Sequence, residues 1–172
     1  MKTINISDKL ILRIKPDLKI YYVNDDFLKF TGFDESQILL HEITDVLPDT
    51  MPDLYREMFA ANIKPDQVSY FIIKGKTADN DNYWGLLRIT PFESKLNGEK
   101  RYLVEIKMLP LNAVKAAGKV FETVEKIYDN TGMKFAKKYL EGFLEEKNMD
   151  FEKFIFDILG VSKKKVDKYF KI

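Results

Sequence analysis

The 172-residue sequence contains no cysteine, and this absence removes several kinds of chemistry at once. Disulfide bonds, thiolate zinc sites, iron–sulfur clusters and cysteine nucleophiles all require a thiol. Histidine is nearly absent as well, since His41 is the only one. Ser–His catalysis would have to pass through this residue, and no nucleophile motif lies near it. The sequence therefore predicts a protein that is not an enzyme.

The sequence also has little net charge and no long apolar run. There are 28 Lys+Arg against 27 Asp+Glu, so the formal net charge is +1, and nothing in this balance predicts a nucleic acid or an anionic membrane as partner. No segment has the roughly 18 to 20 apolar residues that a membrane span requires. The stretch 1–17 is interrupted by Arg13 and Lys15, unlike a signal peptide. We expect a cytoplasmic protein without membrane insertion.

The residues that are present form short apolar runs separated by turn residues. Five such runs predict strands, at 10–12, 20–23, 68–76, 82–90 and 101–109. The connections have the turn residues of antiparallel hairpins. Between the second and third runs, short helices are expected after Asn24, at Asp34 and at Pro52. This order predicts an α+β domain over 9–110, with helices covering one face of a five-stranded antiparallel sheet.

Beyond Pro110 the apolar residues recur at spacings of three and four, which is typical of amphipathic helices. The first helix is expected over 111–129, and others follow Gly132 and end at Gly160. Ser162 begins a short last helix. We therefore expect a helical tail over 111–172, arranged as a bundle or as a helix-loop-helix.

Several stretches of the first domain resemble one family. The segment from Tyr22 to Phe33 reads YVNDDFLKFTGF and resembles the opening signature of PAS domains, in which a strand ends at Asn and a short helix runs into Gly-aromatic. Later stretches are similar to the same family: Met51-Pro52 with Met58-Phe59, and Asn82-Tyr83-Trp84 with Pro91. Together they are most similar to the PAS domains of bacterial aerotaxis and energy-taxis receptors. The resemblance covers 9–109 and implies a PAS fold, which senses a small ligand held between sheet and helices.

The same resemblance suggests FAD as the ligand, because FAD carries the redox signal in the aerotaxis relatives. Those relatives have an Arg-His-Pro-Asp run before Met-Pro, whereas this sequence has Leu47-Pro48-Asp49-Thr50 before Met51. The basic pair that could meet a phosphate or flavin group is missing. The cofactor therefore stays unidentified. Haem is the less favoured alternative, and His41 would be its ligand.

Seven residues are expected to line the ligand pocket: Phe30, His41, Met51, Tyr55, Met58, Phe59 and Trp84, with His41 near the rim. Each also has a plainer explanation. The stripe on the helix after Pro52 has the spacing of a core-facing helix, and Trp84 can simply pack in the core. Because successive strand residues face opposite sides, only one of Tyr83 and Trp84 can line the pocket.

The output of the domain has three alternatives. In the reading we favour, strand 101–109 passes the signal to helix 111–129, and the tail passes it to a partner protein or within a homodimer. In the second, the PAS fold is a ligand-free dimerisation platform. In the third, residues 158–170 bind DNA, since they resemble the turn and second helix of a helix-turn-helix. Phe156 stands where that motif prefers a small residue, and the tail has 13 Lys against 10 Asp+Glu, a net of +3. We therefore expect no DNA binding.

Overall fold

A computed structural model describes residues 9–171 of the chain. The first eight residues, part of the stretch compared with signal peptides, and Ile172 of the tail lie outside the described residues. Five strands form one antiparallel sheet in the order β2-β1-β5-β4-β3. The strands are β1 (Leu10–Ile14), β2 (Ile20–Val23), β3 (Ser69–Lys76), β4 (Asn82–Glu93) and β5 (Lys100–Met108). The predicted α+β fold is confirmed.

Four helices connect β2 to β3: α1 (Asp25–Thr31), α2 (Glu35–Ile38), α3 (Ile43–Val46) and α4 (Pro52–Asn62). The Asn24 side chain accepts a hydrogen bond from the Phe27 backbone N–H, which caps α1 as predicted. Gly32 ends this helix in the left-handed conformation, with φ of 73°. The sequence does not predict α3, whose single turn has no side-chain cap at Glu42.

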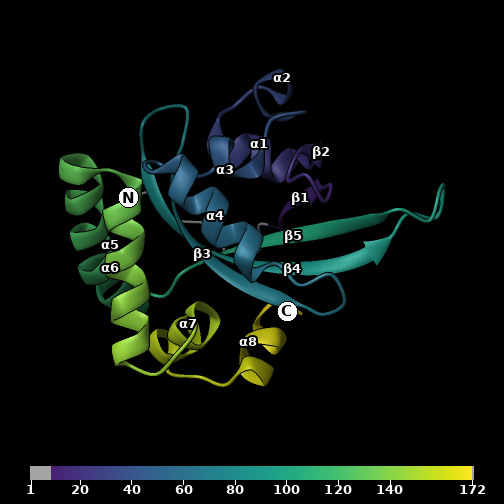
Figure 1. Cartoon of the computed structure of the whole chain (residues 1–172). Coiled ribbons are helices and arrows are strands. Elements are labelled where there is room, and N and C mark those ends of the chain that lie inside the picture. The colour runs from purple at the N-terminus through teal and green to yellow at the C-terminus, as the bar shows by residue number, and fades with distance from the viewer. Residues whose placement is uncertain (1–8, 172) are drawn as a thin grey trace.

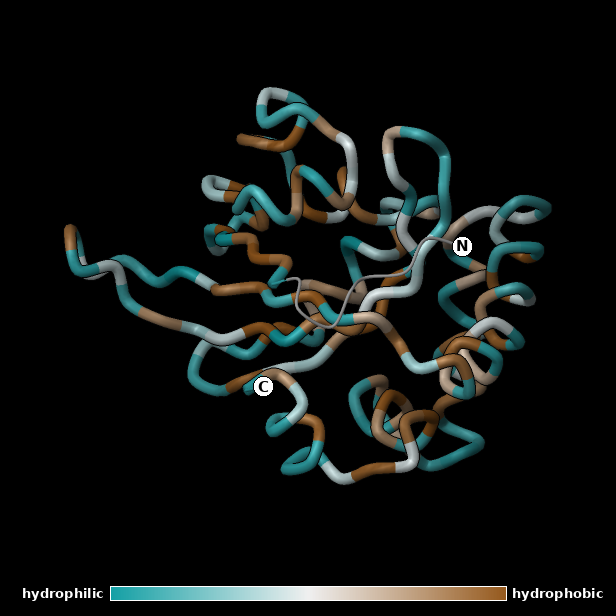
Figure 2. The backbone as a smooth tube through the Cα atoms, turned by 180° about the vertical axis from the view of Figure 1, so that it is seen from behind, coloured by the Kyte–Doolittle hydropathy of each residue, from teal (hydrophilic) through white to brown (hydrophobic). Residues whose placement is uncertain are grey.

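The four helices cover one face of the sheet, which we call the inner face (Figure 1). The pairing of β3 with β4 decides which side chains lie there. Gly75 lies opposite Tyr83, and Phe71 lies opposite Leu87, so these four positions share the inner face. Their neighbours along each strand point to the other side, the outer face. Figure 2 shows the apolar character of the central strands between the two layers of helices.

The tail forms four helices: α5 (Leu111–Thr131), α6 (Met133–Glu146), α7 (Phe151–Leu159) and α8 (Lys163–Tyr169). α5 and α6 pack side by side next to the β3 edge, whereas α7 and α8 lie beneath the outer face (Figure 1). One cluster of buried side chains contains residues of the sheet and of the tail. The sheet therefore has helices on both faces. Within residues 9–171, every helix is too short or too polar to cross a membrane.

Candidate functional site

Aromatic side chains fill the space between α4 and the inner face. Phe30 of α1 lies edge-on to Tyr83, with ring centroids 5.2 Å apart. On α4, Tyr55 and Phe59 both contact Phe71 of β3, at centroid distances of 6.2 and 5.1 Å. All five rings are buried. Protein side chains therefore occupy the place where the sequence predicts a ligand.

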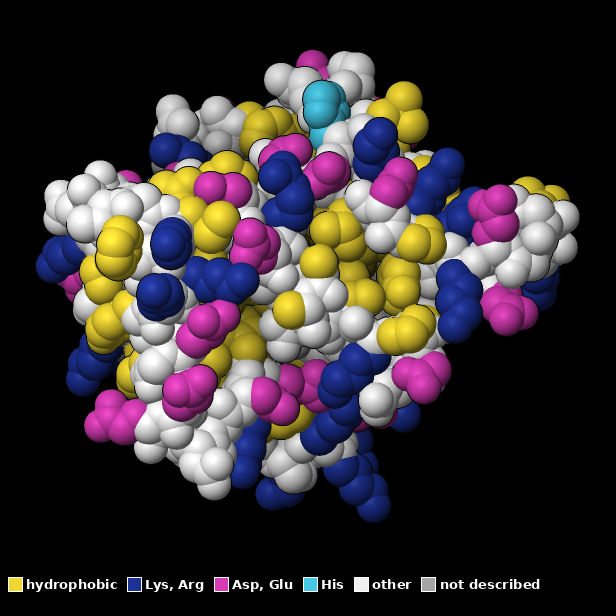
Figure 3. Space-filling view, in the orientation of Figure 1, with side chains coloured by type: hydrophobic (Ala, Val, Ile, Leu, Met, Phe, Trp, Pro, Cys, Tyr) yellow, Lys and Arg dark blue, Asp and Glu magenta, His cyan; other side chains and the backbone are white. Residues whose placement is uncertain are grey.

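Three other predicted pocket residues lie in different surroundings. Met51 is buried just before α4 and has a left-handed backbone, with φ of 54°. Met58 lines a groove of about 530 Å³ between α4 and α6. His41 is exposed between α2 and α3, where its backbone carbonyl accepts a hydrogen bond from Ile20 (Figure 3, cyan). His41 therefore lies at the surface, away from the buried rings.

Trp84 does not lie with the other predicted pocket residues. Strand alternation places it on the outer face, because its neighbour Tyr83 takes the inner face. Its ring meets Phe121 of α5 edge-on, with centroids 5.7 Å apart. Trp84 therefore faces the tail and does not share a wall with the predicted pocket residues of the inner face. The cause is Gly75, whose missing side chain leaves room for the Tyr83 ring on the inner side.

The inner face does not fit the FAD that the resemblance suggests. None of five hollows formed by the described residues is lined by Phe30, Tyr55 or Phe59. A flavin is a flat three-ring system, so several buried rings would have to move to admit it. Three buried hydroxyl groups lack a hydrogen-bond partner among the described residues, those of Thr44, Ser69 and Thr90, but they lie on three different elements. They form no common set of donors for a cofactor.

A second group of rings joins the inner face to the tail around the edge strand β3. Phe121 of α5 stacks on Tyr55 of α4, with centroids 6.0 Å apart and 11° between the ring planes. Phe151 of α7 contacts Phe71 at 5.1 Å and Phe121 at 6.4 Å. We define the aromatic junction as five residues: Tyr55, Phe71, Trp84, Phe121 and Phe151. Phe121 contacts Tyr55 of α4, which covers the inner face, and Trp84 of β4, which points to the outer face. The junction therefore connects the two sides of the sheet.

Hydrogen bonds and ion pairs hold α8 against the outer face. The carboxylate of Asp167 accepts hydrogen bonds from the Tyr70 hydroxyl at 2.8 Å and from Arg88 Nε at 2.9 Å. Arg88 also pairs with Glu105 at 2.9 Å, so one guanidinium bridges β4, β5 and α8. The hydrogen bond from Tyr70, followed by that from Arg88, lowers the pKa of Asp167. Burial and the bond to Asp167 raise the pKa of Tyr70.

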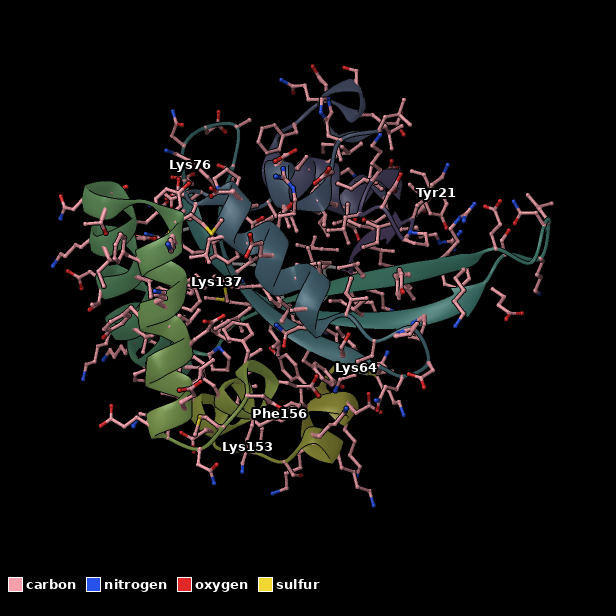
Figure 4. The ribbon with its side chains drawn as sticks, viewed as in Figure 1. Tyr21, Lys64, Lys76, Lys137, Lys153 and Phe156 are labelled. Carbon is pink, nitrogen blue, oxygen red and sulfur yellow. The ribbon has the colours of Figure 1, made fainter. Side chains whose placement is uncertain are left out.

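Further polar contacts tie α5 and α7 to the first domain. Glu152 of α7 is buried and pairs with Lys64, just beyond α4, at 3.4 Å and with Lys163 of α8 at 3.0 Å. Figure 4 labels Lys64 beside the tail helices. The Tyr128 hydroxyl of α5 donates a hydrogen bond to Asp53 of α4, which raises the pKa of Tyr128 to about 12. The tail is thus held by both charge and aromatic packing.

The corner between α7 and α8 has the predicted turn, with Gly160 in the left-handed conformation at φ of 66°. The large side chain of Phe156 does not hold two helices apart here. It reaches the sheet, where its ring meets Tyr70 edge-on at 5.5 Å (Figure 4). α8 buries Val166 and engages the sheet through Asp167. This helix therefore uses one of its faces for docking.

The sequence does contain a signal for the covered outer face. The run Tyr70-Phe71-Ile72-Ile73 in β3 is continuously apolar, and all four residues are buried. A strand with one exposed face alternates apolar and polar residues, whereas a strand covered on both faces reads as a continuous apolar run. The run therefore indicates that something covers the second face. The tail provides that cover.

Comparison with known proteins places this geometry in a family. The family model described as PAS domain matches residues 7–107, and the chain belongs to the PAS family. The PAS domain of an HTR-like protein from Haloarcula marismortui has a TM-score of 0.52 at 20% identity, over 60% of this chain and 83% of that chain. The LOV protein of Rhodobacter sphaeroides has a TM-score of 0.50 at 15% identity, over 78% of this chain and 83% of that chain. No curated protein matches the sequence.

PAS domains are sensory modules of signal transduction, so membership of the family makes sensing the general role of this chain. The predicted similarity to PAS domains is confirmed. The narrower similarity to aerotaxis receptors, and the ligand and partner that it implies, stay predictions. Within residues 9–171, no group of three or more His, Asp or Glu side chains is arranged to hold a metal ion.

Proposed function

We propose that the chain is a PAS sensory module that passes the state of its core to the docked tail through the aromatic junction. The tail then acts on a partner protein or on a second copy. The observation that supports this best is the double contact of Phe121 with Tyr55 and Trp84. Any event that displaces α4 moves Tyr55, and the stacked Phe121 ring then has to follow or lose its contact. A change on the inner face is thereby felt on the outer face.

The tail can act as a two-state element in this proposal. Asp167 and Glu152 hold the tail docked through a small number of ion pairs and hydrogen bonds. A modest free-energy change in the core is therefore enough to shift the population between docked and displaced tails. Displacement would expose Trp84 and Leu86, two large apolar side chains of β4. An apolar surface of this kind binds a partner or a second PAS domain.

The relay is tested with a substitution that removes the stacked ring of the junction but keeps an apolar side chain there. Phe121→Leu should raise amide hydrogen exchange in α5–α8 and also in α4, by about fivefold, because stacked rings contribute about 1 kcal/mol beyond their buried area. The matched control is Phe135→Leu on α6, where the ring is 55% exposed. This control should leave exchange in both regions unchanged. If Phe121→Leu loosened the tail while α4 kept its protection, the two faces would not be coupled and the relay would be wrong.

A second candidate function is the ligand-free dimerisation platform. The filled inner face favours it, since the buried rings leave little reason to require a ligand. Phe135 and Tyr139 are exposed one turn apart on α6, and Figure 3 shows apolar side chains at the surface over α5 and α6. A dimeric mass by light scattering, together with an absorption spectrum free of flavin and haem bands, would favour the platform over a ligand sensor.

The DNA-binding alternative has less support, because the tail has a net charge of only +3, which is small for a DNA-binding segment. In this proposal the module works in the cytoplasm and performs no catalysis. The absence of salt-dependent binding to random duplex DNA would agree with it.

A further inference from the structure

A small apolar hollow lies between the outer face and the α7–α8 corner. Its volume is about 190 Å³. The wall is contributed by β4, by the residue before α5, by the end of α7, by the α7–α8 loop and by α8: Leu86, Pro110, Leu159, Val161, Lys165, Val166 and Tyr169. Six of these seven residues offer carbon-rich surface. The hollow is therefore suited to a molecule with an apolar body.

The volume sets the size of that body. An apolar cavity of about 150 Å³ holds one benzene molecule, whereas pockets for drug-sized ligands measure about 300 to 1,000 Å³. The hollow between β4 and α8 thus accepts a single ring or a short branched chain. A fused two-ring system would extend beyond the hollow.

Two lysines at or beside the wall of the hollow form no ion pair among the described residues. Lys165 belongs to the wall, and the Lys107 ammonium lies 5.3 Å from the centre of the Tyr169 ring, which is also part of the wall. Among residues 9–171, neither lysine has a carboxylate within ion-pair distance. The nearby acids of this face, Glu105 and Asp167, are already engaged by Arg88. An apolar wall that includes one lysine without an ion pair matches a molecule with one apolar group and one negative charge.

We infer that this hollow binds a small apolar carboxylate, such as an aryl-acetate or a short branched-chain acid. The apolar group lies against Leu86 and Leu159, and the carboxylate faces Lys165. Because Leu86 belongs to the sheet and Leu159 to α7, the bound acid bridges the core and the tail. Binding therefore stabilises the docked tail by mass action. This inference deepens the proposed function by naming a ligand class, and it places the ligand outside the inner face.

The test uses the full chain with Leu and Val methyl groups labelled for NMR. Phenylacetate is the anionic probe, and phenylacetamide is its neutral counterpart of the same shape. Biphenylacetate is the probe that exceeds the volume. Phenylacetate should shift the methyl signals of Leu86, Leu159, Val161 and Val166 and leave those of the inner face unchanged. It should bind about threefold more tightly than the amide, as expected for a partly exposed charge pair.

Two lysine variants isolate the charge. Lys165→Gln should lower the affinity for phenylacetate by about threefold, to that of the amide. Lys164→Gln is the matched control, because Lys164 is an exposed neighbour on α8 that is not part of the wall. It should leave the affinity unchanged. Leu159→Phe, which adds a ring at the wall, should abolish the methyl shifts, and an otherwise unchanged spectrum shows that this variant is folded.

Each other outcome would overturn the inference. These outcomes are shifts confined to inner-face methyl groups, equal binding of acid and amide, equal binding of biphenylacetate, and absence of shifts at millimolar probe. Coupling across the aromatic junction is measured separately by the exchange behaviour of Phe121→Leu. Failure of the ligand site and failure of the relay are therefore distinguishable.

Discussion

Gly75 allows the Tyr83 ring of β4 to lie on the inner face, so that Trp84 points to the outer face. A Cβ atom built at this position would overlap the ring of Tyr83, its partner across the β3–β4 ladder. The glycine thus lets Tyr83 lie flat over β3 on the inner face. Trp84 is turned to the outer face as a consequence, and there it meets the tail.

Gly75→Ala should destabilise the protein by about 1 to 3 kcal/mol, because an added methyl group overpacks a rigid core. The matched control is Gly118→Ala on α5, where an added Cβ meets no atom within 4 Å. That change should stabilise by about 0.5 to 1 kcal/mol, since alanine favours the helix. Urea unfolding of both variants measures the difference. Equal stability of Gly75→Ala and the parent would show that the Tyr83 ring can move aside freely.

The sequence predicts that Tyr83 and Trp84 face opposite sides of the sheet, but it does not predict which of them faces α1–α4. That choice depends on strand register, which places Gly75 rather than a larger residue beside Tyr83. Register is a property of pairing between distant segments and not of local pattern. The buried stripe of α4 is predictable from the sequence, because helical spacing by itself places Tyr55 and Phe59 on the buried face.

At the scale of elements, α8 is the part of the tail whose docking depends most on a single carboxylate. Asp167 receives hydrogen bonds from Tyr70 and Arg88, and it also pairs with Lys171. Its pKa is lower in the folded state than its ordinary value of 3.8. The stabilisation is therefore complete above that ordinary value and is lost as the pH falls through the lower, folded pKa.

We expect the amide signals of α8 to keep their docked positions from pH 7 down to the ordinary carboxyl pKa of 3.8, and to move toward disordered positions below it. Asp167→Asn should loosen α8 already at neutral pH and flatten this dependence. Asp157→Asn, an exposed aspartate on α7, serves as control and should behave as the parent. A pH profile of Asp167→Asn identical to that of the parent would assign the effect to other carboxylates.

Most of the elements could be predicted from turn residues and period alone. Asn24, Gly32 and Pro52 each have a local physical role that marks a boundary. The short helix α3 could not be predicted, since one turn without a cap has little intrinsic preference. The packing of the tail could not be predicted from the sequence either. The amphipathic stripe of α5 shows that one face of the helix is buried, but it does not show which residues cover that face.

For the whole molecule, sheet and tail share one hydrophobic core. Removal of residues 111–172 would uncover the outer face of the sheet. In the full chain Ile72, Trp84 and Leu86 are each at most 8% exposed, and Trp84 is covered by Phe121 of the tail. Exposing a large apolar side chain costs about 1.5 to 3 kcal/mol. The truncated domain should be clearly less stable than the full chain.

Residues 1–110 are therefore expected to associate, and light scattering and thermal unfolding should show a larger mass and a lower Tm than those of the full chain. A shorter truncation, 1–162, serves as control because it removes α8 but keeps α5–α7. It should stay closer to the full chain in both measurements. A monomeric 1–110 fragment with the Tm of the full chain would mean that the tail is only loosely attached.

The contacts of Asp167 have a consequence for the order in which the chain folds. Its partners Tyr70 and Arg88 precede it by 97 and 79 residues. Closing such long loops costs entropy that only an existing sheet can offset, so α8 adds to the structure after the strands have paired. During this interval the outer face is formed but bare. We therefore predict a folding intermediate with an apolar sheet surface, and the folding yield should fall as protein concentration rises.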